Sequence, residues 1–308
     1  MEIINRREKL AMNVMLESNI AGLPKPRRGK VRDVYDLGER LLIVTTDRIS
    51  AFDCIFPNGI PHKGRVLNTL ALYWFGRTRD IVENHVIGDD PAALLPPGTP
   101  LDDLRWRCMV VHKCRPIDVE CVVRGYLDGS AWAEYEKQGT LAREPGPKGL
   151  KRKQKFGQPL FTPATKAASG HDENIPFAKV VDTVGREVAE RLRDVSFALY
   201  KRAHDEMLPK GFVLSDTKFE FGWLGDRIIL IDEALTPDSS RFFERDSYVE
   251  GRKSLSMDKQ FVRDFCETTD WDKNPPAPRL PDEIVEKTVE KYLAILNVIT
   301  GRLAPWIE

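Results

Sequence analysis

The stretch from Phe212 to Arg241 constrains the fold more than any other part of this chain. Apolar and polar residues alternate from Phe212 to Phe221, and an aliphatic run, Ile228 to Ile231, follows shortly afterwards. Strict alternation and short aliphatic runs both predict β-strands. The intervening Trp223-Leu224-Gly225 predicts a turn, so the stretch is expected to form a hairpin.

The charged residues of this hairpin are expected to gather on one face. Side chains alternate along a strand, so Asp216, Lys218 and Glu220 point to the same side. A two-residue turn at Leu224-Gly225 would pair Asp232 with Thr217 on the apolar side, whereas a three-residue turn, which Gly225 favours, would pair it with Asp216 and add it to the charged side. Carboxylates on neighbouring strands with a lysine between them can hold a hard cation and the phosphates that it bridges.

A solvated strand face with exposed salt bridges is the competing interpretation of this pattern, because exposed charge pairs are common and contribute little stability. The residues that follow weigh against it. A second acid pair, Asp232-Glu233, is followed by Ser239-Ser240-Arg241, which adds hydroxyl groups and a cation to the same region.

Composition limits the partners and the compartment. The 308 residues hold 47 acidic and 47 basic side chains, so no overall charge favours nucleic acid or an anionic membrane. Five cysteines without C-x-x-C spacing argue against a disulfide framework and a structural zinc site, and indicate a reducing cytoplasm. Residues 1–20 lack the apolar core of a signal peptide and are expected to form an amphipathic surface helix. No apolar run is long enough to span a bilayer.

A second hairpin is predicted near the N-terminus. Gly29 to Asp36 alternates, and the chain returns from Arg40 to Thr46 after a short turn. Lys30 and Arg32 would form a basic edge able to cover a polyphosphate, although an ordinary solvated hairpin face explains the same residues. The sequence has neither a Walker A motif nor G-x-G-x-x-G, so any nucleotide site belongs to another class.

Periodicity predicts the other elements. The expected segments are a helix from Arg65 to Thr78, strands from Arg107 to Lys113 and from Ile117 to Arg124, a helix that begins at Ser130, and helices over Phe177–Leu208, Met257–Thr268 and Asp282–Thr300. Gly301 is expected to end the last helix.

Arg124 and Ser130 lie close together in the chain and suggest an anion site. Ser130 is a plausible N-cap, and the first amides of its helix together with Arg124 could bind a phosphate. A plain cap beside a solvated arginine is the alternative. The irregular segment from Gly139 to Pro176 is long enough to be functional. Its Ser169 and His171 do not lie in a nucleophile elbow, so hydrolase chemistry is not expected there.

Taken together, the sequence resembles the phosphoribosylaminoimidazole-succinocarboxamide synthase family of purine biosynthesis. The segments that carry this resemblance are Gly29-Lys30-Val31-Arg32-Asp33-Val34-Tyr35, Thr46-Asp47-Arg48-Ile49-Ser50-Ala51-Phe52-Asp53, Lys63-Gly64, Glu120-Cys121-Val122-Val123-Arg124-Gly125, Gly129-Ser130, Ser169-Gly170-His171-Asp172-Glu173-Asn174, Asp216-Thr217-Lys218-Phe219-Glu220-Phe221-Gly222, and Asp232-Glu233 with Pro237-Asp238-Ser239-Ser240-Arg241. Each motif is modest alone, but eight in the same order are specific.

The resemblance implies an α+β fold with two lobes, as in ATP-grasp and kinase-like folds. An N-terminal antiparallel-sheet lobe, residues 1–115, would cover ATP, and a larger C-terminal α+β lobe, residues 116–308, would carry the metal and the substrates. It implies an ATP-dependent carbon–nitrogen ligase that joins carboxyaminoimidazole ribonucleotide and L-aspartate through an acyl phosphate, giving the succinocarboxamide (SAICAR), ADP and phosphate. Such an enzyme would be a cytoplasmic monomer or homodimer without nucleic-acid or membrane partners.

The resemblance also implies roles for individual residues. The nucleotide would contact Gly29, Lys30, Val31, Arg32, Val34, Lys113 and Glu120. The imidazole ribonucleotide would bind Arg124, Ser130 and Arg241, chiefly through its phosphate. Glu220 and Asp232 would hold Mg²⁺, while Lys218, Asp216 and Asp172 would serve catalysis. The chemistry of the reaction adds that the attacking amine must lose a proton, which Asp216 or Asp172 could accept if within hydrogen-bond reach.

Two other functions fit parts of the sequence. A small-molecule or lipid kinase would place ATP similarly and transfer phosphate to a hydroxyl group. A non-catalytic nucleotide-binding module would use the charged face to sense ATP without turnover. Release of ADP that requires both the carboxylated ribonucleotide and aspartate would exclude both of these functions.

Overall fold

The computed structural model describes residues 14–165, 173–249, 256–257 and 259–307. The chain divides into two units, each assembled from separate segments. Unit 1 comprises Met1–Tyr73, His85–Lys113 and Lys259–Glu308, and unit 2 comprises Trp74–Asn84 and Cys114–Asp258. The division into lobes 1–115 and 116–308 stays a prediction.

Unit 1 contains a five-stranded antiparallel sheet. Its strands, in spatial order, are β1 (Arg27–Arg28), β2 (Arg32–Asp36), β3 (Arg40–Thr45), β7 (Cys108–His112) and β6 (Val86–Gly88). The predicted N-terminal hairpin is confirmed, because β2 and β3 pair from Arg32↔Thr45 to Asp36↔Leu41. One core cluster of the unit gathers around this sheet and includes the buried residues Tyr35, Leu42, Val44 and Val110.

Unit 1 has further elements, some of which form a second core. They are the two-stranded β4 (Ser50–Ala51) and β5 (Cys54–Ile55), the helix α2 (Lys63–Arg77), whose last residues enter unit 2, the short η1 (Ala92–Leu94), and the helices α6 (Gln260–Cys266) and α7 (Asp282–Thr300). Ile49, Phe56 and Ile60 pack with Val262 and Val289 from α6 and α7. The predictions of α2, α6 and α7 are confirmed, including the end of α7 at Gly301, where φ is 68°.

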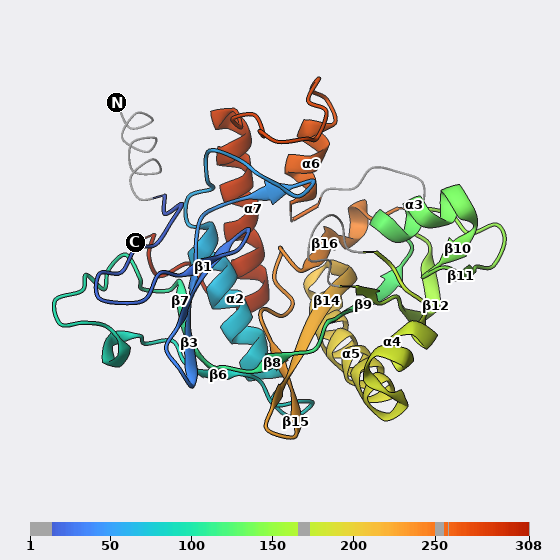
Figure 1. Ribbon diagram of the computed structural model, residues 1–308. Helices are drawn as coiled ribbons and strands as arrows, with labels where there is room; N and C mark the ends of the chain where they lie inside the picture. The colour runs from blue at the N-terminus through green and yellow to red at the C-terminus, as the bar shows by residue number, and fades with distance from the viewer. Residues whose placement is uncertain (1–13, 166–172, 250–255, 258, 308) are drawn as a thin grey trace. The chain divides into compact units, whose positions relative to one another are not determined.

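Unit 2 is built on a larger antiparallel sheet (Figure 1). Its main path runs β12 (Lys155–Phe161), β9 (Val119–Tyr126), β14 (Phe212–Leu224) and β15 (Arg227–Ile231), and β13 (Ala164–Thr165), β16 (Ser240–Glu244) and β8 (Arg115–Pro116) join it. β14 is the central strand, because β9, β16, β15 and β8 all pair with it. A separate pair consists of β10 (Thr140–Leu141) and β11 (Glu144–Pro145).

The helices of unit 2 are α3 (Gly129–Gln138), α4 (Phe177–Val184), α5 (Arg186–Met207) and the short η2 (Leu208–Lys210) and η3 (Arg245–Ser247). The single helix predicted from Phe177 to Leu208 is wrong, because Gly185 adopts φ 83° and separates α4 from α5. The apolar stripe of α5, including the buried Leu192, Val195 and Leu199, packs on β14 and β9 as scaffold.

None of the helices within the described residues is both long enough and apolar enough to cross a membrane.

The buried His85 of unit 1 makes the fold sensitive to acid. Burial, and then the charges of Arg32 and His112, lower the pKa of His85 from 6.5 to about 3. Between these two pKa values, His85 is protonated in the unfolded chain but neutral in the folded chain. The stability of the fold therefore decreases as the pH decreases. The free energy of unfolding is expected to decrease by about 1.4 kcal/mol per pH unit below pH 6.5 through this residue alone.

His85→Gln, which cannot titrate, should therefore flatten the acid side of the stability profile measured by urea unfolding between pH 4 and pH 7. His112→Gln is the matched control, since His112 lies in the same unit but is exposed. An unchanged slope in His85→Gln, or an equal change in both variants, would contradict the assignment.

Candidate active site

The central strand β14 brings the predicted charged residues together. Asp216, Lys218 and Glu220 lie at alternate positions of this strand, and Lys218 contacts Glu220 across that spacing. Asp216 and Glu220 are buried, whereas the Lys218 side chain is 29% exposed. Partners on the neighbouring strands complete two rows of ionised side chains. One row crosses the sheet at Asp216, and the other runs along β14 from Lys218 to Glu220 with Glu120 of β9 beside it.

The first row consists of Arg124, Asp216 and Arg241, one from each of three adjacent strands. Arg124 of β9 stands opposite Asp216 of β14, which stands opposite Arg241 of β16. Arg241 donates through Nε to Oδ1 of Asp216 at 2.8 Å and through Nη2 to Oδ2, and Arg124 donates to Oδ2 through Nη1. Asp128 lies 3.9 Å from Nη1 of Arg241 and is itself paired with Arg152. The three arginines and two carboxylates together leave a net positive charge, which suits an anionic ligand.

Arg124 is fixed by two further hydrogen bonds. Its Nε donates to the Thr162 hydroxyl at 2.8 Å, and its Nη2 donates to the Ser130 hydroxyl at 2.9 Å. Burial lowers the pKa of Arg124, and the charge of Asp216 opposes that effect. The structure thus brings together Arg124, Ser130 and Arg241, the three residues that sequence comparison assigned to one ligand.

The prediction that Ser130 caps the following helix is wrong. α3 begins one residue earlier, and Asp128 is its N-cap, accepting from the Gly129 amide at 2.8 Å. Asp128 is buried and also accepts from Nε of Arg152 at 3.1 Å. An aspartate is as good a cap as a serine, so the cap leaves the Ser130 hydroxyl available to Arg124.

The second row consists of Glu120, Lys218 and Glu220. The Lys218 ammonium donates to Oε1 of Glu120 at 2.7 Å and to Oε1 of Glu220 at 2.6 Å. Burial lowers the pKa of Lys218, but the charges of Glu220, Glu120 and Asp232 outweigh it and raise the pKa well above its ordinary value. Lys218 is therefore a fixed cation and not a proton donor near neutral pH.

The turn that precedes Asp232 differs from the prediction. A three-residue turn ending at Gly225 was expected, but the last pair of the hairpin is Leu224↔Arg227, which leaves a two-residue turn. In this register β15 ends at Ile231, opposite Glu220. Asp232 then adopts φ 64°, which carries the chain out of the ladder, and its charge still acts on Lys218.

The acidic residues of the second row, together with Asp232, offer oxygen ligands that suit a hard cation. Glu120, Glu220 and Asp232 with Lys218 carry a formal charge of about −2, which a divalent ion would neutralise. Across the residues that the structure describes, no group of three or more Asp, Glu, His or Cys side chains is preassembled as a metal site. Mg²⁺ needs only one or two carboxylates when phosphates complete its shell, so the residues present fit it.

In unit 1, the predicted nucleotide residues Gly29, Lys30 and Val31 form the loop between β1 and β2. The loop is closed by the Gly29 amide, which donates to the Arg32 carbonyl at 2.7 Å. Lys30 is exposed and pairs with Asp53. Such a loop, with an exposed cation at its tip, resembles loops that cover phosphates.

Sequence reasoning missed the residues that hold this loop. Thr46 donates to the Val31 carbonyl through its hydroxyl at 2.6 Å and its amide at 2.9 Å. Arg48 donates to the carbonyls of Gly29 at 2.9 Å and Lys30 at 3.4 Å, and to Asp33 at 2.8 Å. The only signal was the polar run that follows β3. A buried arginine was not expected from it.

The turn that presents Asp53 is strained. Phe52 and Asp53 have φ values of 52° and 61° between β4 and β5. Glycine and asparagine are usual in such turns, and phenylalanine is a genuine outlier. Phe52 packs edge-to-face on Trp271 with 6.1 Å between ring centroids, which offsets the cost and turns Asp53 toward Lys30.

The remaining predicted residues are more scattered. Val34 lies on β2 of unit 1, and Lys113 follows β7, where its ammonium pairs with Asp36 at 2.7 Å. Glu120 belongs to unit 2 and contacts Lys218. Asp172 lies outside the described residues, with most of the Ser169-to-Asn174 motif.

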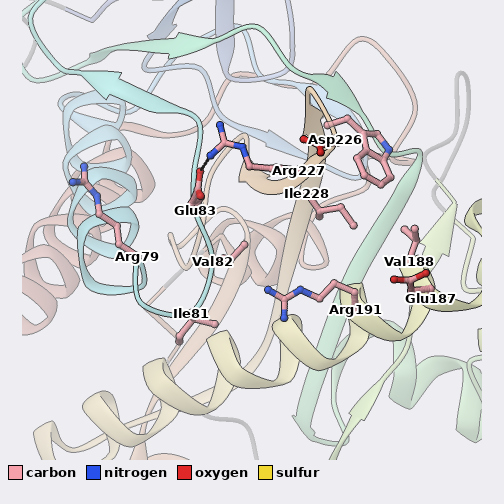
Figure 2. Close-up of a pocket in the computed structure, with 11 residues that line it drawn as sticks. Arg79, Ile81, Val82, Glu83, Glu187, Val188, Arg191, Asp226, Arg227 and Ile228 are labelled. Carbon is pink, nitrogen blue, oxygen red and sulfur yellow. Dashed lines mark hydrogen bonds and ion pairs between the residues drawn. The ribbon is translucent and has the colours of Figure 1, made fainter.

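A separate cavity of about 600 Å³ lies in unit 2 but carries none of the predicted residues (Figure 2). Figure 2 shows Arg191 of α5 reaching into it and Arg227 paired with Glu83 at its rim. Three arginines and three acids line this cavity, so its charges balance. It lacks the net charge that a phosphate or metal site needs.

The SAICAR synthetase family matches residues 25–278 of the chain. The phosphoribosylaminoimidazole-succinocarboxamide synthases of Citrifermentans bemidjiense and Syntrophotalea carbinolica are 49% and 50% identical to it, each over 94% of this chain and 98% of the relative. A SAICAR synthase structure from Saccharomyces cerevisiae, complexed with SAICAR, superposes with a TM-score of 0.86 at 39% identity, covering 94% of this chain and 99% of that one.

A substitution at Gly129 can test the row formed by Arg124, Asp216 and Arg241. Its φ is 55°, and a Cβ there would lie 2.2 Å from Nη1 of Arg241. Gly129→Ala should displace the guanidinium, while Gly139→Ala, at φ 70° with nothing within 4 Å, is the matched control. Both should lose roughly 1–2 kcal/mol to backbone strain.

Only Gly129→Ala is expected to lose the stabilisation that inorganic phosphate gives to the wild-type protein in thermal unfolding. Equal stabilisation of both variants by phosphate would show that Arg241 does not depend on this close contact.

Proposed function

This chain belongs to the SAICAR synthetase family, and from that premise we infer that it is an ATP-dependent ligase of purine biosynthesis. It joins carboxyaminoimidazole ribonucleotide to L-aspartate and releases ADP and phosphate. The roles of individual residues in this reaction are proposals, and they rest on the geometry of unit 2.

The observation that carries the proposal is the spacing of the two charged rows on β14. Asp216 and Glu220 are four residues apart, which corresponds to about 13 Å along a strand, and Lys218 lies halfway. A ligand with a phosphate at one end and a reacting carboxylate at the other would match this arrangement. The imidazole ribonucleotide has both groups.

The row formed by Arg124, Asp216 and Arg241 would hold the ribonucleotide phosphate. Arg124 and Arg241 supply guanidinium groups with a planar fork of donors, and the Ser130 hydroxyl lies beside them. Because Arg124 and Asp216 are nearly fully buried, these interactions occur in a low dielectric and are stronger than in water. The phosphate end of the substrate would thus be anchored away from the reacting carboxylate.

Lys218 would act at the reacting carboxylate. A carboxylate is a poor electrophile, so its oxygen first attacks the γ-phosphorus of ATP and ADP leaves, giving an acyl phosphate. The aspartate amine then attacks the acyl carbon, the amide forms and inorganic phosphate leaves. A fixed ammonium beside these oxygens neutralises the charge that develops in each step.

Glu220 and Asp232 would hold Mg²⁺ together with the ATP phosphates. The bound ion would supply charge neutralisation and orientation for the phosphates. Glu120 would keep Lys218 in place, since it accepts from the ammonium at 2.7 Å. In unit 1, the loop formed by Gly29, Lys30 and Val31 would bind nucleotide phosphates. Asp172 would accept the proton of the amine.

The proposed function predicts a strict dependence on substrates. Release of ADP, followed with a coupled assay, should require ATP, the carboxylated ribonucleotide and L-aspartate together, and should be abolished by EDTA. ADP released without aspartate at the full rate would point to a kinase, and nucleotide binding without turnover would point to a sensing module.

Lys218→Ala should lower turnover by roughly two to three orders of magnitude, because a charged transition-state contact is lost. Removing the ammonium also leaves Glu120 and Glu220 opposed, so thermal unfolding and circular dichroism must accompany the kinetics. Lys201→Ala, an exposed lysine of α5, is the control and should keep wild-type turnover. Near-native activity of a folded Lys218→Ala would remove Lys218 from the mechanism.

A further inference from the structure

We propose that Asp216 is a positioning residue that holds Arg124 and Arg241 in a phosphate-binding arrangement. This inference rests on the proposed function and changes the role of one residue within it. The family resemblance placed Asp216 among the catalytic residues, and the chemistry of the amine made it one of two candidates for the proton acceptor. The contacts of Asp216 do not support the role of proton acceptor.

Both oxygens of Asp216 are engaged by guanidinium groups. Oδ1 accepts from Nε of Arg241 at 2.8 Å, and Oδ2 accepts from Nη2 of Arg241 and Nη1 of Arg124. Three charge-assisted hydrogen bonds stabilise the ionised carboxylate, which makes it a weak acceptor for the proton of an amine. A general base needs an oxygen directed at the substrate, and the geometry directs these oxygens at the arginines.

The two arginines need a carboxylate between them. Each guanidinium is nearly buried, with 5% and 13% of the side chains of Arg124 and Arg241 exposed. Their mutual repulsion contributes to lowering the pKa of Arg124, after burial and the opposing charge of Asp216. Without the carboxylate the two cations would separate, and a ligand would have to order them again when it binds.

A β-bulge aligns the row. On the β14–β16 ladder Leu214 pairs with Phe242, but the next pair along β14 is Asp216 with Arg241, so the register shifts at Ser215. In an unbroken ladder Arg241 would stand opposite Ser215, on the other face of the sheet. The extra residue turns Arg241 to the face of Asp216, a use of bulges that is common beside active sites.

Two effects of Asp216→Asn oppose each other. Removing a negative charge from an anion site should strengthen the attraction of phosphate, whereas losing three charged hydrogen bonds should scatter the guanidinium groups. The amide nitrogen of asparagine would also meet guanidinium donors with donors of its own. Because the arginines are buried and repel each other, we expect the loss of guanidinium positioning to outweigh the stronger attraction, so that phosphate binding weakens.

The experiment measures binding and turnover separately. In calorimetry without ATP, Asp216→Asn should bind ribose 5-phosphate roughly 10- to 100-fold more weakly than wild type. In steady state, the KM for the carboxylated ribonucleotide should rise by a similar factor, the KM values for ATP and aspartate should change little, and kcat should fall less than about threefold. Asp216→Glu, which restores the charge, should recover part of the affinity.

Asp246→Asn is the matched control, since Asp246 lies just beyond β16 in an exposed pair with Arg245. Circular dichroism and thermal unfolding establish that each variant is folded, and Asp216→Glu is the test variant if Asp216→Asn does not fold. Unchanged or tighter binding of ribose 5-phosphate by the folded variant, or a collapse of kcat with unchanged KM, would overturn the positioning role. Failure of the wild-type protein to bind ribose 5-phosphate or to form ADP would instead refute the proposed function.

Discussion

The central position of β14 is the constraint on which the candidate site depends. This strand is paired by β9 and β16 along its first half and by β15 and β8 along its second. Pairing on both sides fixes the direction of every side chain, and one face receives Asp216, Lys218 and Glu220. The partner strands then decide which charges stand beside them. A site on three paired strands is held more rigidly than one on loops, which suits a reaction that depends on positioned charges.

The two rows solve opposite electrostatic problems with the same device. In one, a carboxylate separates two arginines, and in the other, an ammonium separates two glutamates. Like charges on adjacent strands destabilise a sheet, and a central counter-ion removes that cost. Each row keeps a net charge after this pairing, positive for the arginines and negative for the acids. Unit 2 can therefore fold with its ligand charges in place, and the ligands complete the neutralisation.

The sequence predicted the strands and the gathering of charges better than the details of register. Alternation along β14 and the spacing of β2 and β3 were sufficient, because period-2 patterns report directly which face is buried. Local conformations were not accessible in this way. The two-residue turn before Arg227, the positive φ of Asp232 and the break at Gly185 depend on single residues. The supporting contacts of Arg48 and Thr162 join segments far apart in the chain, so a local sequence pattern cannot predict them.

Regular strand pairing alone would not place all of the charged side chains of the candidate site, and irregular backbone positions make up part of the difference. A perfect ladder between β14 and β16 would direct Arg241 away from Asp216, and a hairpin continued beyond Ile231 would pair Asp232 with Phe219, on the face that Glu220 does not share. The bulge corrects the first mismatch, and the left-handed residue ends the ladder at Ile231. Irregularities of this kind persist only where the surrounding structure over-determines them, and buried pairs on both sides of β14 provide that support. The sheet supplies the rigidity, and the bulge selects which charges of the arginine row face one another.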